Sequence, residues 1–550
     1  MERDLTLKKE INRIRYTAKH RGQEIGWLLY NRDTSTIDEI FIHKGFEGKG
    51  FEIWMLDKLI EQHTLVSAEI PCSDQKTFNL LVDYGFRPTK TFKKTDLPFY
   101  KMELSAAILL KKLKDKKPVR PYKKEEIVAI ERISDSMSYE DIKRGVQNII
   151  KNLGGIERFI KKGNTVVIKP NIVSDHGLKD GIYKGGIVTD IRVVRSIIET
   201  ILPIAGRIII AEGSSINRSA TTKMFEHYGY DRLVDIDPKR ISLVDLNKDE
   251  VVEKKVPEGK RMVSRNIPVT LEKAHVFINV PVLKIHFAAI VSLSIKSLQG
   301  AVPPLEKYMS HFFGLWQNLI NIHKIIKPGL TIIDGLVGQE DFGPVSGTPK
   351  EMNILIGGIN PVAIDATAMR IMGIDPLLSP PVFLAYMQGM GPVEKNMIKI
   401  IGEPMDNVAS PFKQPHIDIK GGRDFIVHDW GACSGCKGYL HFVLTKLRRP
   451  DPADECRLLI DRPFDNKVNL FLGPELNAEI NPHEKNIFMG MCQAHNAHKG
   501  TYLPGCPPHA EVMVNGIYSL FPDVERPKYA DESEEKKLGE MLNHILQGMV

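Results

Sequence analysis

The sequence lacks cysteine over most of its length and has no long apolar run. Of its six cysteines, Cys72 stands alone and the other five follow residue 432. No apolar stretch approaches the ~20 residues that a membrane-spanning helix requires, and charged residues occupy positions 2–4, where a secretory signal needs an apolar segment. These absences argue against a membrane protein and against a disulfide-stabilised secreted protein, so we expect a cytoplasmic location.

The sequence also has little net charge outside one short segment. Lysine and arginine number 75 and aspartate and glutamate 68, which leaves +7. Residues 111–124 contain eight positive residues and one negative residue, so this segment accounts for the whole excess. We therefore predict a solvated basic linker over 106–125 and no nucleic-acid partner. At 550 residues the chain is too long for one core, so several domains are expected.

A first α/β domain is expected over 1–105. The glycine-rich turn 45–50 follows a predicted strand and precedes a helical pattern, an arrangement in which free N–H groups at the helix start can bind an anion. An ordinary strand–turn–helix junction explains the turn equally well. The expected elements are strands at 25–30, 37–42, 66–70 and 99–104, and helices beginning near 53 and at 74–83.

This domain resembles the Gcn5-related N-acetyltransferase family in the glycine turn and in Tyr84-Gly85-Phe86 after the next helix. The resemblance implies that Gly48, Lys49 and Gly50 bind the pyrophosphate of acetyl-CoA. The family usually begins this turn with arginine or glutamine and often has a tyrosine four residues before the later glycine. This chain has Gly45 and Leu81 at those positions.

A second domain is expected over 126–415 as an α/β fold with a mainly parallel sheet, because apolar strands alternate with helical patterns. The helix after residue 361 has clear ends, with Asn360 as its cap, Pro361 in its first turn and Gly373 after it. The expected strands are 127–130, 165–168, 207–211, 276–279, 331–333 and 353–356, and the expected helices are 139–153, 190–202, 221–229 and 362–372.

Polar residues follow several of these strands, where ligands bind in open α/β sheets. Rim solvation or helix capping would explain any one of them alone. Together, three lysines and a histidine predict a site for an anionic small-molecule substrate, a carboxylate or a phosphate. The candidate catalytic residues are Lys169, Glu212, Lys284, His286, Lys296 and Asp365.

The second domain also resembles domain-of-unknown-function family 362. The similar segments are 167–171, 185–190, 211–213, 282–286, 333–335 and 360–365. The family name specifies no reaction, although its members are often attached to iron–sulfur modules. A Lys-Asn pair is usual in the family where this chain has Lys296-Ser297.

A third domain is expected over 424–525, followed by a helical tail over 526–550. Two cysteines three positions apart can bind one metal centre from a single loop, and two later cysteines near strand ends can complete the site. Four thiolates suit either tetrahedral zinc or a [4Fe–4S] cluster; buried, inert thiols are the alternative. The predicted metal ligands are Cys433, Cys436, Cys492 and Cys506.

This third domain resembles two related iron–sulfur proteins. The segment 504–517, PGCPPHAEVMVNGI, is similar to the small iron–sulfur subunit of NADH–quinone oxidoreductase, and Cys433-Ser434-Gly435-Cys436 is similar to the opening motif of the nickel–iron hydrogenase small subunit. The resemblance implies a flavodoxin-like fold with one [4Fe–4S] cluster on the four cysteines. Cys456 matches no ligand position.

From these features we predict an iron–sulfur redox enzyme whose cluster exchanges electrons with a partner and with an anionic substrate of the central domain. Two alternatives remain open. One is CoA-dependent N-acyl transfer with a structural cluster, and the other is a non-catalytic redox sensor or scaffold.

Overall fold

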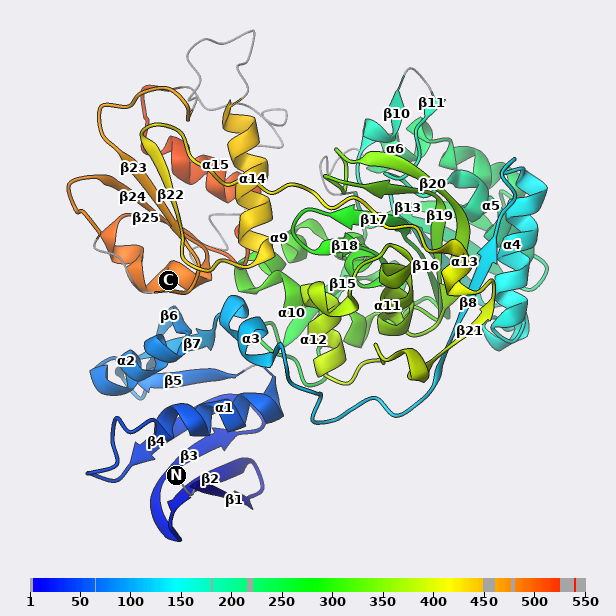
Figure 1. Ribbon diagram of the computed structural model, residues 1–550. Helices are drawn as coiled ribbons and strands as arrows, with labels where there is room; N and C mark the ends of the chain where they lie inside the picture. The colour runs from blue at the N-terminus through cyan, green and yellow to red at the C-terminus, as the bar shows by residue number, and fades with distance from the viewer. Residues whose placement is uncertain are drawn as a thin grey trace. The chain divides into compact units, whose positions relative to one another are not determined.

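The computed structural model describes residues 3–64, 66–179, 182–214, 221–448, 460–475, 480–524 and 539–540. These residues form two compact units, Met1–Val119 with Asp418–Val550 and, separately, Arg120–Ile417 (Figure 1). The first and third expected domains therefore share one unit, and the second expected domain makes up the other. None of the described helices is long and apolar enough to cross a membrane.

The first part of the shared unit, here called the N-terminal domain (residues 3–113), is a seven-stranded sheet in the order β1-β2-β3-β4-β5-β7-β6. Neighbouring strands are antiparallel except β4 and β5, which run parallel and pair only at 36–37 and 67–68. The elements are β1 (Arg3–Lys9), β2 (Arg13–His20), β3 (Gln23–Asn31), β4 (Thr36–Ile42), α1 (Phe51–His63), β5 (Ser67–Pro71), α2 (Gln75–Tyr84), β6 (Phe86–Lys94), β7 (Leu97–Leu104) and α3 (Ala106–Leu113).

Two features of this domain differ from the expectation. Strands β1, β2 and β6 were not predicted, although alternate residues of β2, such as Tyr16 and Ala18, are buried as one face of a sheet. The segment expected as a basic linker begins with helix α3, because Ala106, Leu109 and Leu113 recur at helical spacing and are buried.

The second part of the shared unit, here called the cysteine domain (residues 425–518), is a four-stranded parallel sheet in the order β22-β23-β24-β25. This sequential order differs from the 2-1-3-4-5 order of flavodoxin-like sheets, so the expected flavodoxin-like arrangement is not confirmed. Apart from 539–540, the expected tail lies outside the described residues. The elements are β22 (Phe425–Asp429), α14 (Ser434–Arg448), β23 (Val468–Leu472), β24 (Lys485–Met489), a 3₁₀ helix (Met491–Lys499), β25 (Thr501–Leu503) and α15 (Ala510–Tyr518).

The central unit (residues 120–417) contains a ten-stranded sheet in the order β13-β12-β9-β16-β19-β20-β8-β21, with β17 beside β19 and β18 beside β17. The strands from β13 to β19 are parallel, as are β8 and β21, which confirms a mainly parallel sheet; β20 is antiparallel to both of its neighbours. The sheet strands are β8 (Glu126–Arg132), β9 (Thr165–Pro170), β12 (Arg207–Glu212), β13 (Ile241–Asp245), β16 (Val276–Val280), β17 (Val282–His286), β18 (Ile290–Ser292), β19 (Leu330–Glu340), β20 (Thr348–Gly358) and β21 (Ile398–Gly402).

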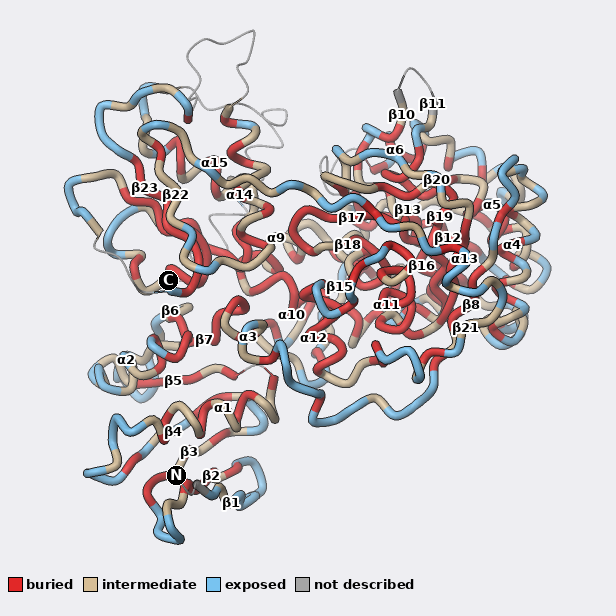
Figure 2. Tube along the Cα trace, viewed as in Figure 1, coloured by how far each residue is buried: buried red, intermediate tan, exposed pale blue. Residues whose placement is uncertain are grey.

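Helices pack on both faces of this sheet because its central strands are apolar on both sides. In β9, Val166 and Ile168 pack against α4 and α5, whereas Val167 between them joins a second core with α7 and α10. The strands labelled β12, β16 and β19 are drawn mostly as buried in Figure 2. Asn360 caps α11 by accepting hydrogen bonds from two backbone N–H groups, as predicted. The helices are α4 (Tyr139–Asn152), α5 (Ile191–Ile201), α6 (Thr221–His227), α7 (Val269–Glu272), α8 (Ser294–Ser297), α9 (Pro304–Phe313), α10 (Leu315–Ile325), α11 (Pro361–Ile371), α12 (Pro380–Met387) and α13 (Met405–Val408), and two short ribbons pair β10 (Leu178–Lys179) with β11 (Ile182–Tyr183) and β14 (Val251–Lys255) with β15 (Ser264–Pro268).

Candidate functional site

The strand order of the central unit creates a switch point at β9. From β9 the chain builds outward to β12 and β13, and then returns to place β16 on the other side of β9. Ligands of open α/β sheets bind outside the carboxyl ends of the strands at such a point. Lys169 and Glu212 lie at the carboxyl ends of β9 and β12, and Asn279 of β16 is in register with Lys169.

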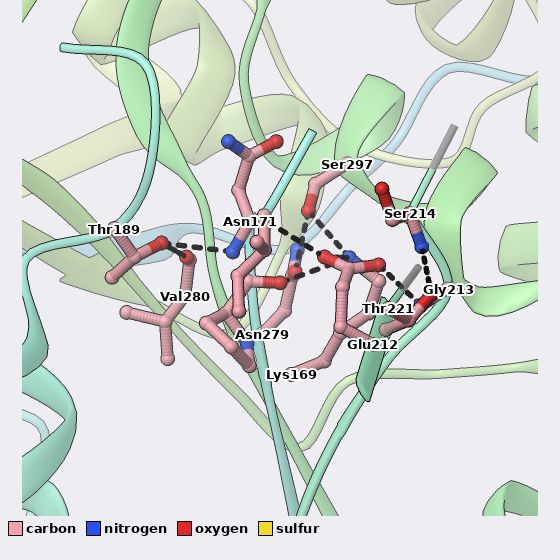
Figure 3. A network of polar contacts seen from close by, with 12 residues as sticks. Lys169, Asn171, Thr189, Glu212, Gly213, Ser214, Thr221, Asn279, Val280 and Ser297 are labelled. Atoms are coloured by element: carbon pink, nitrogen blue, oxygen red, sulfur yellow. Dashed lines mark hydrogen bonds and ion pairs between the residues drawn. The ribbon is translucent and has the colours of Figure 1, made fainter. Parts of the chain in front are cut away.

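Lys169 and Glu212 form a buried ion pair at this point. The Lys169 Nζ is 3.0 Å from Glu212 Oε2, and the two side chains are 1% and 3% exposed. Glu212 also accepts hydrogen bonds from the backbone N–H groups of Ile172 and Gly213, at 3.1 and 2.7 Å. Figure 3 shows these groups directed at one another. The charges of Lys169 and Glu212 neutralise each other, and the pair links the carboxyl ends of β9 and β12.

A serine and an asparagine extend this network toward α8. Lys169 Nζ donates to Ser297 Oγ at 3.3 Å, and Ser297 Oγ donates to Asn279 Oδ1 at 3.0 Å (Figure 3). Gly300 lies so close that a Cβ there would be 2.2 Å from Glu212 Oε1. Ser297 is therefore part of this network. It stands where the family that this domain resembles usually has asparagine.

Lys284 and His286 lie on β17 and are almost completely buried. Lys284 Nζ donates to the Ile187 carbonyl at 2.9 Å, and no carboxylate pairs with it among the described residues. His286 Nδ1 accepts from the N–H groups of Ala288 and Ala289, so its proton is assigned to Nε2. Burial lowers the pKa of Lys284 to about 7 and that of His286 well below its usual value.

Lys296, on α8, belongs to the same electrostatic cluster. It is half-buried and forms no hydrogen bond or ion pair with the described part of the chain. Burial, followed by the charge of Lys169, lowers the pKa of Lys296 to about 8. The charge of Lys296 in turn contributes to the lowered pKa values of Lys284 and His286. The cluster thus carries positive charge that the described residues do not neutralise.

Asp365 has a different position from the other predicted site residues. Its two carboxylate oxygens accept hydrogen bonds from the backbone N–H groups of Ser294 and Ile295, at 2.8 and 3.0 Å. It is 1% exposed, and burial raises its pKa to about 7 although these hydrogen bonds oppose the rise. Both oxygens are used at the start of α8, so Asp365 positions the helix that carries Lys296 and Ser297.

Gln339 is a buried residue that sequence reasoning missed. It lies on β19 in register with Lys284, and side chains in register on parallel strands share a face. Its side chain is fully buried, yet neither amide atom has a hydrogen-bond partner among the described residues. A Cβ at Gly343 would be 3.0 Å from its Oε1. Its only sequence signal is a polar residue near the end of an apolar strand.

The four predicted metal ligands follow three of the four strands in the sheet of the cysteine domain. Cys433 and Cys436 lie after β22, in the turn and first turn of α14, while Cys492 follows β24 and Cys506 follows β25. Two hydrogen bonds tie the last two loops together, from the Gly490 N–H to the Leu503 carbonyl and from the Met491 N–H to the Gly505 carbonyl. The parallel sheet thus brings all four thiols to its carboxyl edge. Cys456 lies outside the described residues.

The four thiols interact electrostatically. A hydrogen bond with Cys433, burial, and the negative charges of Cys492 and Cys506 raise the pKa of Cys436 well above its usual value. A Cβ at Gly490 would lie 3.3 Å from Cys436 Sγ, so a side chain there would crowd the thiols. In the described ranges, no three histidine, cysteine, aspartate or glutamate side chains are arranged as a site for a metal ion.

The glycine turn of the N-terminal domain forms as predicted but contains a carboxylate. Gly48 and Gly50 have left-handed backbones with φ of 68° and 79° before α1, and a Cβ at either would meet nothing within 4 Å. The Gly48 N–H donates to the side chain of Glu52 at 3.2 Å, and Glu52 is buried. Lys49 Nζ lies 5.3 Å above the centre of the Phe46 ring. One N–H group of the turn that was predicted to bind pyrophosphate therefore donates to an acid instead.

One family model matches the part of the chain that contains the lysine cluster. Residues 166–370 match a family described as a domain of unknown function, DUF362. All six residues predicted as catalytic fall in this range, and the four cysteines lie outside it. The chain is also 24% identical over 292 residues to a thylakoid-associated protein of Synechocystis sp., a match that covers 51% of this chain and 86% of that protein.

Solved structures similar to this chain include acetyltransferases. A GNAT family acetyltransferase from Elizabethkingia anophelis with acetyl-CoA bound is 18% identical, covers 17% of this chain and 76% of its own, and gives a TM-score of 0.15. An IAA acetyltransferase from Bacillus cereus is 16% identical, covers 17% of this chain and 77% of its own, and also gives a TM-score of 0.15.

Proposed function

We propose that the protein is an iron–sulfur redox protein that binds one [4Fe–4S] cluster on its four clustered cysteines and an anionic small molecule beside Lys284 and Lys296. The observation that carries the proposal is the placement of the four cysteines after strands of one parallel sheet, at its carboxyl edge. Thiolates are the usual ligands of such clusters, and a bound cluster would supply one-electron transfer.

The residues around the thiols support a four-thiolate group. Gly490 leaves space beside Cys436 that a larger residue would fill. Cys433 and Cys436 flank the first turn of α14, where backbone N–H groups are available to stabilise negative charge. Cys436, Cys492 and Cys506 are buried, which favours retention of a bound group over exchange with solvent.

The central unit supports an anion-binding role. Lys169 is neutralised by Glu212, but Lys284 and Lys296 have no carboxylate partner among the described residues. Buried charges are normally paired, so the buried Lys284 and the half-buried Lys296 beside it favour an anionic ligand. The orphaned amide of Gln339 offers one donor and one acceptor next to Lys284. His286 would hold its Nε2 proton as a further donor.

The observed glycine turn argues against the CoA-dependent alternative. Glu52 accepts the Gly48 N–H and brings a negative charge to the place where a pyrophosphate would bind. Two anions in one site repel each other, and the acid would have to move. Calorimetric titration of the full chain with acetyl-CoA tests this alternative, and tight binding by wild type would favour acyl transfer.

Anaerobic purification with iron, sulfide and zinc analysis and electron paramagnetic resonance tests the cluster. We expect about four irons and four sulfides per chain, as a [4Fe–4S] centre requires, and their loss in Cys506→Ala. The matched control is Cys72→Ala, because Cys72 follows β5 in the N-terminal domain and is not one of the predicted ligands. One zinc without sulfide would contradict the proposal and make the cysteine domain structural.

Anion binding is tested separately by calorimetry with inorganic sulfate, which keeps its charge across the neutral range. Lys296→Met should weaken sulfate binding by about tenfold, the effect of losing one charge-assisted hydrogen bond. Lys399→Met is the control, because Lys399 is exposed on β21. Equal sulfate affinity in Lys296→Met and Lys399→Met would show that Lys296 does not contact the bound anion.

A further inference from the structure

The N-terminal domain contributes a buried arginine to the cysteine domain. Arg87 is the second residue of β6, and its side chain is completely buried. Its guanidinium donates to the carbonyls of Val82 and Phe86 in its own domain, each at 2.7 Å. It also donates to the carbonyls of Cys492 at 2.6 Å and Pro474 at 2.7 Å. One side chain thus joins two segments of the chain that are about four hundred positions apart.

No carboxylate contacts Arg87 within the described part of the chain, and all four of its hydrogen bonds end on neutral carbonyl groups. Asp83 acts on it only from a distance and is exposed. Burying a charge without a counter-charge costs several kcal/mol. Two other buried charges of the chain are paired with an acid, Arg265 with Glu306 and Lys169 with Glu212.

A serine of the same domain contacts the same cysteine. Ser105 lies between β7 and α3 and is completely buried. Its Oγ is 2.9 Å from Cys492 Sγ, within hydrogen-bond distance for a sulfur acceptor. Strand β6 packs against the 3₁₀ helix Met491–Lys499, which contains Cys492. Residues of the N-terminal domain therefore contact both the backbone carbonyl and the sulfur of Cys492, one of the predicted metal ligands.

We propose that the N-terminal domain is a cap for the cysteine site, in which Arg87 supplies the positive charge that balances the thiolate-bound group and Ser105 donates a hydrogen bond to the Cys492 sulfur. The inference rests on the proposed function, because it requires the four thiols to hold a cluster. Four thiolates carry more negative charge than a four-iron core carries positive charge, so the assembled group is an anion. That anion supplies the counter-charge which Arg87 lacks.

This role explains why the acetyltransferase-like fold is present although its glycine turn contains Glu52. The surface that contacts the cysteine site is formed by β6 and the start of α3, not by the glycine turn before α1. Arg87 and Ser105 are positioning residues that act through Cys492. They are expected to change how firmly the group is held and how easily it is reduced.

The test uses the full chain, loaded with iron and sulfide under anaerobic conditions, as wild type, Arg87→Met, Arg87→Lys and Ser105→Ala. Two quantities are measured: iron retained after challenge with a chelator, and the midpoint potential from a redox titration followed by electron paramagnetic resonance. Hydrogen bonds and nearby charge set these potentials, and loss of a supporting contact typically reduces metal affinity 10–100-fold.

Arg87→Met should lose iron faster and shift the midpoint to a lower potential, because the reduced cluster carries one more negative charge. Arg87→Lys keeps the charge and should lie close to wild type in potential. Ser105→Ala should keep about four irons and show a smaller downward shift. The controls are Arg15→Met and Ser67→Ala, in the same domain but bonded to Glu24 and to the Ser35 carbonyl.

The two levels of the proposal fail in different ways. If wild type takes up no iron and sulfide, or only zinc, the proposed function fails and the cap inference fails with it. If wild type holds the cluster but Arg87→Met keeps both wild-type iron retention and the wild-type midpoint, only the cap inference is overturned. Should Arg87→Met fail to fold, Ser105→Ala decides, and an unchanged midpoint in that variant overturns the inference.

Discussion

Each of the two units buries an arginine, and the two arginines are compensated differently. In the central unit, Arg265 pairs through Nε with Glu306 and donates to Ser310 Oγ at 2.9 Å. In the other unit, Arg87 donates only to carbonyl groups. A charge neutralised by a neighbouring acid serves the fold in every state of the protein. In the proposals above, a buried charge that lacks such an acid is neutralised by the anion that the protein binds.

The same contrast exists within the central unit. Lys169 and Glu212 neutralise each other at the switch point, while Lys296 has no acidic partner among the described residues and lies in the same electrostatic cluster. Internally paired cations therefore mark structure, and unpaired cations mark the two places where we propose that anions bind. Four predictions test whether this distinction holds.

The largest effect is expected when an internally neutralised pair is broken. Glu306→Leu should destabilise the central unit by about 3–5 kcal/mol, because it leaves the Arg265 charge buried and unpaired. The loss should be the same with and without iron. Hydrogen exchange followed by mass spectrometry on peptides of the central unit measures it, because the two units need not unfold together. A loss below about 1 kcal/mol, as for an exposed ion pair, would contradict the distinction.

The next effect concerns the carboxylate that positions α8. Asp365→Asn should cost about 1–3 kcal/mol at pH 5, where Asp365 is protonated in the folded protein. Both oxygens of the neutral acid can still accept a hydrogen bond, whereas the asparagine NH2 group would face one of the two backbone N–H donors. The folded pKa of Asp365 is raised to about 7. Its contribution to stability is therefore present below the unfolded pKa and lost as pH rises toward 7.

The deficit of Asp365→Asn should accordingly narrow between pH 5 and pH 8, as followed by urea unfolding at each pH. Asp375→Asn is the matched control, because Asp375 is an exposed cap that accepts one backbone N–H and asparagine caps equally well. A deficit that stays constant with pH would show that Asp365 is not the titrating group.

The sequence alone predicted the positions of some of these residues but not the roles of others. The parallel strands, the capped helix α11 and the strand-end residues Lys169 and Glu212 were predictable, because they depend on local periodicity and on the rule that parallel strands end at one edge. The role of Asp365 was not, since its partners are two backbone groups about seventy positions earlier in the chain.

Contacts across the shared unit could not be predicted at all. Arg87 is one charged residue at the start of a strand, and nothing near it in the sequence indicates Cys492 as a partner. Strands β1 and β2 were missed although apolar and polar residues alternate along both of them. Helix α3 was missed because its lysines led us to predict a linker, although four of its apolar residues are buried. In the sequence, Glu52 is an acidic residue like many others in the first turn of a helix. Only the structure shows that it accepts a hydrogen bond from the Gly48 N–H.

The third prediction uses pH to identify the unpaired lysines. Sulfate binding should be strongest where Lys284 and Lys296 are both protonated and should weaken as pH rises through about 7 and 8. Each lysine that must be protonated contributes up to a tenfold loss per pH unit above its pKa. Lys296→Arg keeps its charge and should give a shallower decline in calorimetric titrations at several pH values. Identical slopes in the two proteins would exclude Lys296 from direct contact with the anion.

The smallest effect on stability, and the most discriminating, is expected at Gln339. Its two amide atoms are buried without a partner among the described residues, so Gln339→Leu removes no hydrogen bond. The free energy of unfolding should therefore stay within about 1 kcal/mol of the wild-type value or rise. If a ligand satisfies the amide beside Lys284, the same variant should weaken ligand binding. Gln317→Leu is the control, because the Gln317 amide is buried but bonded to Asn321 and Gln388, and it should lose stability without losing affinity. The opposite result, a destabilised Gln339→Leu that binds sulfate as wild type does, would show that Gln339 serves the fold and that the unpaired charge of the lysine cluster is neutralised elsewhere.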